Sequence, residues 1–219
     1  MTIQRAAIET ILLARDWPAL LALAQRKRRL LSAILPFTYQ PEGLLRWRAV
    51  EALGLAARAV AARDPEFVRG LLRRLQWSLS DESGGIGWSA PEAMGEIVAA
   101  RSDLFADFGP IVAALFETLE EDYFRPGILW GVGRIAEQAP VIVGNAYEPA
   151  LACLDDARPA VRGLAARCLG RLGRLEARER LRGLWQDKAT LAVYREGELV
   201  TVTVSDEARE AIARLARQG

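Results

Sequence analysis

The segment RPAVRGLAARCLGRLG, residues 158–173, decides the fold class. It begins in a turn signal, residues 156–159, and continues as a helical pattern of apolar residues. Near its end stands Leu169-Gly170-Arg171-Leu172, which places a glycine inside the helical pattern. A glycine there costs a helix about 1 kcal/mol relative to alanine. We therefore expect a neighbouring helix to approach closely at Gly170.

The same pattern of apolar, small, any and apolar residues recurs along the chain. Upstream of each copy lies a turn signal, and upstream of that turn lies another amphipathic run. The repeating unit is therefore helix, turn, helix. Isolated pairs of this kind cannot bury their apolar faces, whereas stacked pairs build a continuous core. The small residues are Gly54, Gly95, Gly133, Gly170 and Ala213, with spacings of 41, 38, 37 and 43 residues.

This repeat predicts an all-α protein, a short right-handed α-solenoid of roughly six helical hairpins. We expect one domain that spans residues 1–219. The predicted pairs of helices are 2–14 with 17–25, 27–36 with 43–62, 65–79 with 90–101, 104–121 with 127–138, 141–154 with 159–172, and 175–188 with 206–217.

The segment 158–173 resembles the HEAT-like repeats of phycobilisome-lyase subunits, and the resemblance extends over about residues 40–217. It includes an arginine eight residues before the small residue, at Arg46, Arg125 and Arg162, with Gly87 in its place in the third copy. The resemblance implies that these arginines brace the turn through acidic or carbonyl partners. It also implies the fold and leaves the function open, because this scaffold serves unrelated roles.

The chain contains no histidine, and this excludes Ser-His-Asp and Cys-His nucleophile systems and histidine-rich metal sites. We expect a protein that is not an enzyme and has no metal or other cofactor. Cys153 and Cys168 lie in helical apolar patterns, so we expect buried free thiols. No stretch has the length of a membrane span, and residues 1–17 lack a signal-peptide layout, so we expect a cytoplasmic protein.

The net charge is +1, but the charges are unevenly distributed. Residues 1–75 hold 13 basic and 6 acidic residues, residues 76–160 hold 4 and 14, and residues 161–219 hold 12 and 8. This layout favours either polar partner surfaces, including self-association, or ordinary solvated helix faces. The acidic middle indicates a protein or peptide partner with basic groups.

Two insertions lengthen the repeat, and both fall in the turn between the first and second helices of a pair. The first covers residues 80–89. The second, residues 190–204, has strand-like residues around Glu196-Gly197 and predicts a β-hairpin. Insertions at equivalent turns of a solenoid project on one edge, so we expect a shared functional edge. The hairpin either caps the last helices or pairs with a second copy in a homodimer.

The Gly-rich first insertion allows three interpretations. A dinucleotide fingerprint needs a preceding strand, and residues 65–79 are predicted to be a helix. A purely structural turn would use Ser89 and Glu92 as a capping box, with Trp88 packed on the first turn. Partner binding is the third. Its candidate residues are Asp81, Glu82, Ser83, Gly84, Gly85 and Trp88 in the loop, with Trp47, Trp130, Tyr123 and Arg125 on neighbouring repeats.

The leading hypothesis is a non-enzymatic interaction or scaffold module that binds a protein or peptide through its concave face and insertion edge. One alternative is a DNA glycosylase of the alkylation-repair type, which also uses HEAT-like helices. The near-neutral charge makes nucleic acid an unfavoured partner. The other alternative is a lyase-like or chaperone-like subunit for a cofactor-carrying protein, and only the resemblance supports it.

Overall fold

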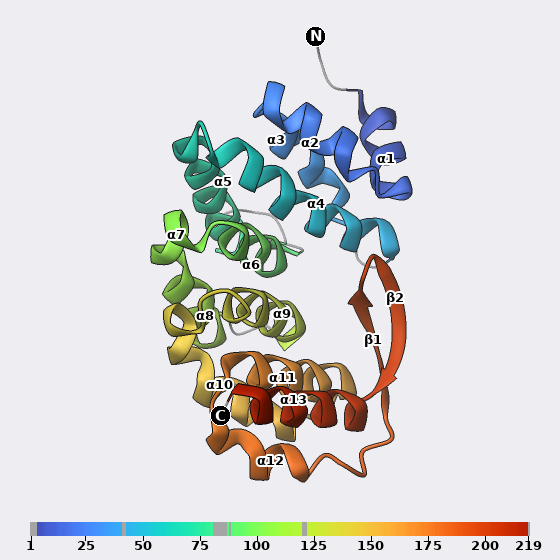
Figure 1. The fold of residues 1–219 in the computed structure, drawn as a ribbon, viewed down its shortest axis with the longest axis vertical. Helices are drawn as coiled ribbons and strands as arrows, with labels where there is room; N and C mark the ends of the chain where they lie inside the picture. The colour runs from blue at the N-terminus through green and yellow to red at the C-terminus, as the bar shows by residue number, and fades with distance from the viewer. Residues whose placement is uncertain (1–3, 41–42, 81–86, 88, 120–121, 219) are drawn as a thin grey trace.

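A computed structural model describes residues 4–40, 43–80, 87, 89–119 and 122–218. Within these ranges the chain is an array of helices with one small antiparallel hairpin (Figure 1), so the predicted all-α solenoid with a C-terminal hairpin is confirmed. The α-helices are α1 (Arg5–Ala14), α2 (Trp17–Arg26), α3 (Leu30–Ile34), α4 (Leu44–Ala61), α5 (Pro65–Trp77), α6 (Ala90–Ala100), α7 (Ser102–Phe105), α8 (Gly109–Thr118), α9 (Arg125–Ala136), α10 (Tyr147–Ala152), α11 (Pro159–Leu172), α12 (Arg178–Arg182) and α13 (Val204–Gln218).

The second helices of the pairs stack on one another in the order α4, α6, α9, α11, α13, which we call the second-helix row (Figure 1). Glycines bring these helices together as the repeat predicts. A Cβ on Gly95 of α6 would lie 2.2 Å from the Cα of Gly131 in α9. A Cβ on Gly170 of α11 would lie 2.7 Å from the Cα of Ala211 in α13. Ala213, the predicted small residue of the last copy, is exposed, and the contact is made one half-turn earlier.

The first helices of the pairs are less regular than predicted. Residues 104–121 and 141–154 are each divided by short 3₁₀ segments, because Pro110 and Pro149 lack the amide that would continue a helix from the preceding turn. These first helices pack against the helices of the second-helix row. The 3₁₀ segments are η1 (Leu35–Phe37), η3 (Ala106–Phe108), η4 (Asp122–Phe124), η5 (Pro140–Ala146), η6 (Cys153–Asp155) and η7 (Leu175–Ala177).

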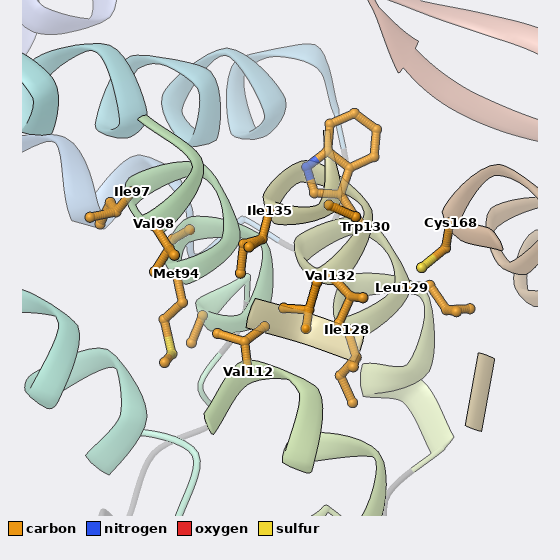
Figure 2. Close-up of a cluster of buried hydrophobic side chains, with 14 of the residues drawn as sticks. Met94, Ile97, Val98, Val112, Ile128, Leu129, Trp130, Val132, Ile135 and Cys168 are labelled. Atoms are coloured by element: carbon orange, nitrogen blue, oxygen red, sulfur yellow. The ribbon is translucent and has the colours of Figure 1, made fainter. Parts of the chain in front are cut away.

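The core is a continuous aliphatic layer between the two rows of helices. Figure 2 shows its middle, where Met94 and Val98 of α6 and Val112 of α8 lie near Ile128 and Val132 of α9, and Cys168 of α11 lies beside Leu129. Both cysteines are buried free thiols, as predicted, and burial raises the pKa of Cys168 to about 12.

Capping follows the sequence at one predicted site and departs from it at another. The Asp64 carboxylate accepts the Phe67 amide at the start of α5, with Pro65 in the first turn. The predicted capping box of Ser89 and Glu92 is wrong. Ser89 has a left-handed backbone and its hydroxyl donates to the Thr38 carbonyl oxygen instead, because the side chain is turned toward the preceding repeat.

Of the arginines that the HEAT-like resemblance singles out, Arg125 and Arg162 contact their own turns, whereas Arg46 contacts the start of the next repeat's second helix. Arg46 donates to the Ser89 hydroxyl at 2.6 Å and also pairs with Glu92. Arg162 donates to the Asp156 carbonyl oxygen at 2.8 Å and pairs with Asp187 at the same distance. Part-buried polar contacts such as those of Arg46 therefore connect α4 to α6, in addition to the apolar core.

The hairpin consists of β1 (Thr190–Arg195) and β2 (Glu198–Thr203), with Glu196 and Gly197 at positive φ in the turn. It does more than cap the last pair. Its base follows α12 and leads into α13, whereas its tip reaches the start of α4 at the opposite end of the array (Figure 1). In the part of the chain that the structure describes, no helix combines the length and apolarity needed to cross a membrane.

Candidate functional site

The predicted site residues fall into three groups in the structure. Asp81, Glu82, Ser83, Gly84, Gly85 and Trp88 lie outside the described residues. Trp47 and Trp130 are brought together on the second-helix row. Tyr123 and Arg125 lie at the turn that precedes α9, where Tyr123 packs on Phe124 and Arg125 pairs with Asp122 at 3.0 Å. Their role in partner binding stays a prediction.

Trp47 and Trp130 form an aromatic cluster with Tyr194 of the hairpin. The two indole rings come from α4 and α9, which lie on either side of α6, and their centroids are 4.5 Å apart. The Tyr194 ring stacks on Trp47 at 5.7 Å with the planes 9° apart. Figure 2 shows the Trp130 ring standing away from the aliphatic cluster and toward the hairpin. Trp130 is only 5% exposed, so most of its side-chain surface is buried against other residues of the protein.

A polar clasp holds the hairpin tip against the first repeats. Arg48 of α4 is buried and donates through Nε to the Gly197 carbonyl oxygen at 3.0 Å, through Nη1 to the Leu13 carbonyl oxygen, and through Nη2 to Glu198 at 2.7 Å. Arg15, just after α1, donates to the Glu196 carbonyl oxygen at 2.8 Å. The clasp therefore joins α1, α4 and the hairpin through charge-assisted hydrogen bonds.

Glu51 of α4 connects this clasp to the aromatic cluster. Its carboxylate accepts from Arg15 at 2.9 Å and from the Tyr194 hydroxyl. Burial raises the pKa of Tyr194, and the adjacent Glu51 carboxylate raises it further, so the phenol stays protonated and remains a donor. Through these contacts the hairpin, which belongs to the last pair of helices, is held against the first two pairs, and this closes the array.

Beside the hairpin tip, the second-helix row carries two adjoining hollows, which we call the second-helix groove. One has a volume of about 300 Å³ and is bounded by Trp130, Tyr194 and residues of α11 and α13. The other has a volume of about 500 Å³ and runs toward the C-terminal ends of α4, α6 and α9. Glu51, Glu96 and Arg134 line both hollows, so the two form one groove across several repeats.

Paired charges, some of them buried, lie along the floor of the groove. Arg134 of α9 is half-buried and pairs with the buried Glu96 of α6 at 2.7 Å and with Glu137, which lies just outside the groove lining. Arg171 of α11 pairs with Glu137 at 2.8 Å. Burial lowers the pKa of Arg171 to about 10, which leaves it charged at neutral pH. The floor therefore carries both signs of charge in fixed positions.

Buried charges of both signs, with aromatic rings at one end, suit recognition of a polar chain. Burial raises the pKa of Glu96, against the opposing effect of Arg134 and the Trp130 indole N–H. Burial also lowers the pKa of Arg167, whose Nε has no hydrogen-bond partner. Among the described residues, no group of three or more Cys, Asp or Glu side chains has the arrangement of a metal site.

Comparison with known proteins identifies the type of fold. No known family's sequence profile matches the chain. An uncharacterized protein of Archaeoglobus fulgidus is 34% identical over 116 residues, which are 53% of this chain and 57% of that protein, so the chain matches little more than half of that relative. An engineered protein of known structure aligns with 100% of this chain and 94% of its own, with 16% identity and a TM-score of 0.54. A computationally designed armadillo repeat protein for modular peptide recognition aligns with 92% of each chain, with 17% identity and a TM-score of 0.50.

The fold is an α-helical repeat solenoid, similar to that of the designed armadillo repeat protein. These identities are low, so they describe the architecture alone. The narrower resemblance to phycobilisome-lyase subunits stays a prediction.

Sequence reasoning missed the residues that hold the hairpin to the rest of the solenoid. Nothing in the sequence pattern distinguishes Arg15 or Arg48 from the other arginines, or Glu51, one turn after Trp47, from the other carboxylates. Tyr194 carried the only signal, as the single aromatic residue of the predicted hairpin. An aromatic side chain on a hairpin that is too small to be stable alone indicates that the hairpin packs on another surface.

Proposed function

We propose that this solenoid is a non-enzymatic binding scaffold and that the second-helix groove holds a segment of a protein partner in extended form. The observation that carries the proposal is the groove itself. It crosses α4, α6 and α9, it ends at Trp130 and Tyr194, and its walls present charges of both signs. An extended polar peptide can pair with these charges along its length.

The repeat fold supports this proposal in a general way, because solenoids present extended binding surfaces. The designed armadillo protein with a similar fold was made for peptide recognition. The expectation of basic groups on the partner stays a prediction. Several carboxylates of the acidic middle already pair with arginines in this chain, as Asp107 does with Arg69 and Glu137 with Arg171.

The test is a steric block of the groove. Ala100 lines the wider hollow, so Ala100→Trp fills it while every charged side chain is retained. Ala216→Trp is the matched control, because Ala216 is exposed on α13 and lines neither hollow. Peptides would be selected from a random displayed library against the wild-type protein, and their affinities measured for all three proteins by fluorescence anisotropy.

We expect the selected peptides to bind Ala100→Trp at least about tenfold more weakly, which is a loss of about 1.4 kcal/mol. Ala216→Trp should bind them as the wild type does. Equal binding by the two variants would show that the groove is not the peptide site. Circular dichroism of each variant checks that the helical fold is intact.

A further inference from the structure

A hollow larger than either part of the second-helix groove lies away from it, at the N-terminal end. It has a volume of about 1250 Å³. One wall is the junction of α2 and α3, residues 26–33, and the other is the exposed side of α5, from Glu66 to Arg74. We call this hollow the basic groove. Volumes of about 300–1,000 Å³ are usual for small-molecule pockets, so this hollow is large enough for a segment of a chain.

The lining of the basic groove is strongly positive. It includes Arg26, Lys27, Arg28, Arg29 and Arg74, against the single carboxylate of Glu66. Four of the cations are consecutive in the sequence and therefore repel one another. Arg28 pairs with Asp64, but within the described chain no ion pair joins Arg26 or Arg29 to a carboxylate. The groove therefore holds positive charge that the protein itself leaves uncompensated.

The floor of the basic groove is apolar and open. The half-buried Phe67 ring lies in it, with the Arg28 guanidinium 5.0 Å from the ring centroid. Ala33 and Gly70 line the groove next to it. A Cβ on Gly70 would have no atom within 4 Å, so this glycine is not required by helix packing, and the space above it is free.

We propose that the basic groove binds an acidic peptide segment of a partner protein. Carboxylate side chains of the segment pair with the cations of the rim, and an apolar side chain packs against Phe67 on the floor. Charge complementarity supports this occupant, since Arg26 and Arg29 line the groove and neither forms an ion pair within the described chain. The α2 C-terminus contributes no anion site of its own, because its carbonyl end favours cations.

A short acidic segment fits better than a nucleic acid. On the next repeat, Asp103 pairs with Arg101 and Asp107 pairs with Arg69 of α5. A long phosphate backbone would therefore run from the basic groove onto arginines that are already paired, whereas a short acidic peptide ends within the groove. Phe67 is also the one aromatic residue of the lining, which offers little for the stacking of successive bases.

The experiment uses a fluorescein-labelled glutamate-rich peptide with a central tryptophan, titrated with the full chain at low and high salt. Two variants test the site from different directions. The double variant R26E/R29E reverses two cations of the rim. Gly70→Trp blocks the floor without removing any charge, and Gly70→Ala is its matched control because a methyl group adds little volume there. A lysine-rich peptide of the same length controls for charge, and single-stranded and duplex DNA serve as competitors.

We expect the acidic peptide to bind the wild type, to be weakened by salt, and to lose about tenfold in affinity in R26E/R29E and in Gly70→Trp. Gly70→Ala should bind as the wild type does. Absence of binding at low salt, or equal binding by all variants, would overturn the proposal. So would displacement of the peptide by DNA at lower concentration, or self-association of the wild type that Gly70→Trp abolishes. The result is independent of the second-helix groove, because Ala100→Trp leaves the basic groove unchanged.

Discussion

Replacing Gly95 with alanine tests whether close backbone contact holds the second-helix row together. A Cβ on Gly95 would lie 2.2 Å from the Cα of Gly131 and 2.7 Å from its carbonyl oxygen. Both of these atoms belong to the backbone of α9, so no side-chain rotation can relieve the clash. Ordinary contact begins at about 3.4 Å, and α6 and α9 must therefore separate by about 1.2 Å.

The magnitude follows from two opposing effects. An added methylene in a tightly packed position costs about 1–3 kcal/mol, and a clash with backbone belongs at the upper end of that range. Alanine is favoured over glycine inside a helix by about 1 kcal/mol. The net loss in the free energy of unfolding is then about 2 kcal/mol. For a chain of this length the melting temperature falls by about 2–4 °C per kcal/mol, so we expect a decrease of about 4–8 °C.

Gly70→Ala is the matched control, since Gly70 also lies inside a helix but a Cβ there meets no atom within 4 Å. It should raise the melting temperature by about 1–4 °C through helix propensity alone. The melting temperature of each variant is measured by circular dichroism at 222 nm, which follows the helix signal. Urea titration then gives the free energy of unfolding of each variant. The reasoning is refuted if Gly95→Ala is as stable as the wild type while Gly70→Ala shows the expected gain.

Three further predictions concern the clasp, the thiols and one carboxylate. Arg48→Met loses the hydrogen bonds to the hairpin turn, at a cost of about 2 kcal/mol. Amide hydrogen exchange in residues 190–203 should then accelerate by at least about tenfold, while the exchange rates in α6 and α9 stay the same. Cys153 and Cys168 should resist a thiol reagent at pH 8 in the native protein and react in denaturant, because burial raises the pKa of both thiols; rapid native labelling would contradict this. The Arg158 guanidinium holds the pKa of Asp156 at about 2, so that carboxylate should stabilise the fold above pH ~4 and lose its contribution as pH falls toward about 2. A carboxyl-carbon NMR titration should show the pKa of Asp156 moving upward in Arg158→Ala.

The repeat could be predicted because its physical requirements are local. The small-residue pattern around Gly95 and Gly170 records where two helix backbones meet, and that requirement is visible in four consecutive residues. The start of α5 could also be predicted, because Asp64 caps it through a contact with Phe67, only three positions away. The capping box at Ser89 failed because the hydroxyl is used by Thr38 and Arg46, which are more than forty positions earlier in the chain. A local sequence pattern carries no information about a hydrogen-bond partner that is so far away in the chain.

The clasp could not be predicted from the sequence, because its hydrogen-bond partners are also far apart in the chain. Arg48 donates to Gly197, 149 positions away, and Tyr194 donates to Glu51, 143 positions away. The hairpin was evident from its strand composition, but composition gives no direction in space. What the hairpin would cover depended on the superhelical path of five stacked helices, which is a property of the whole array and not of any one repeat.

Closing the array changes what a repeat solenoid can do. In an open solenoid each repeat contacts only its neighbours, so the ends can move apart when a ligand enters. Here the tip of the hairpin ties α1 and α4 to the last pair, and Glu51 belongs both to that clasp and to the wall of the second-helix groove. A ligand that engages Glu51 from the groove competes with, or reinforces, the hydrogen bonds from Arg15 and Tyr194. By thermodynamic linkage the clasp must then change the affinity of the ligand by the same factor by which the ligand changes the stability of the clasp. We therefore infer that groove occupancy and hairpin docking form one coupled equilibrium, and that weakening the clasp at Arg48 changes peptide affinity even though Arg48 lines neither hollow of the groove.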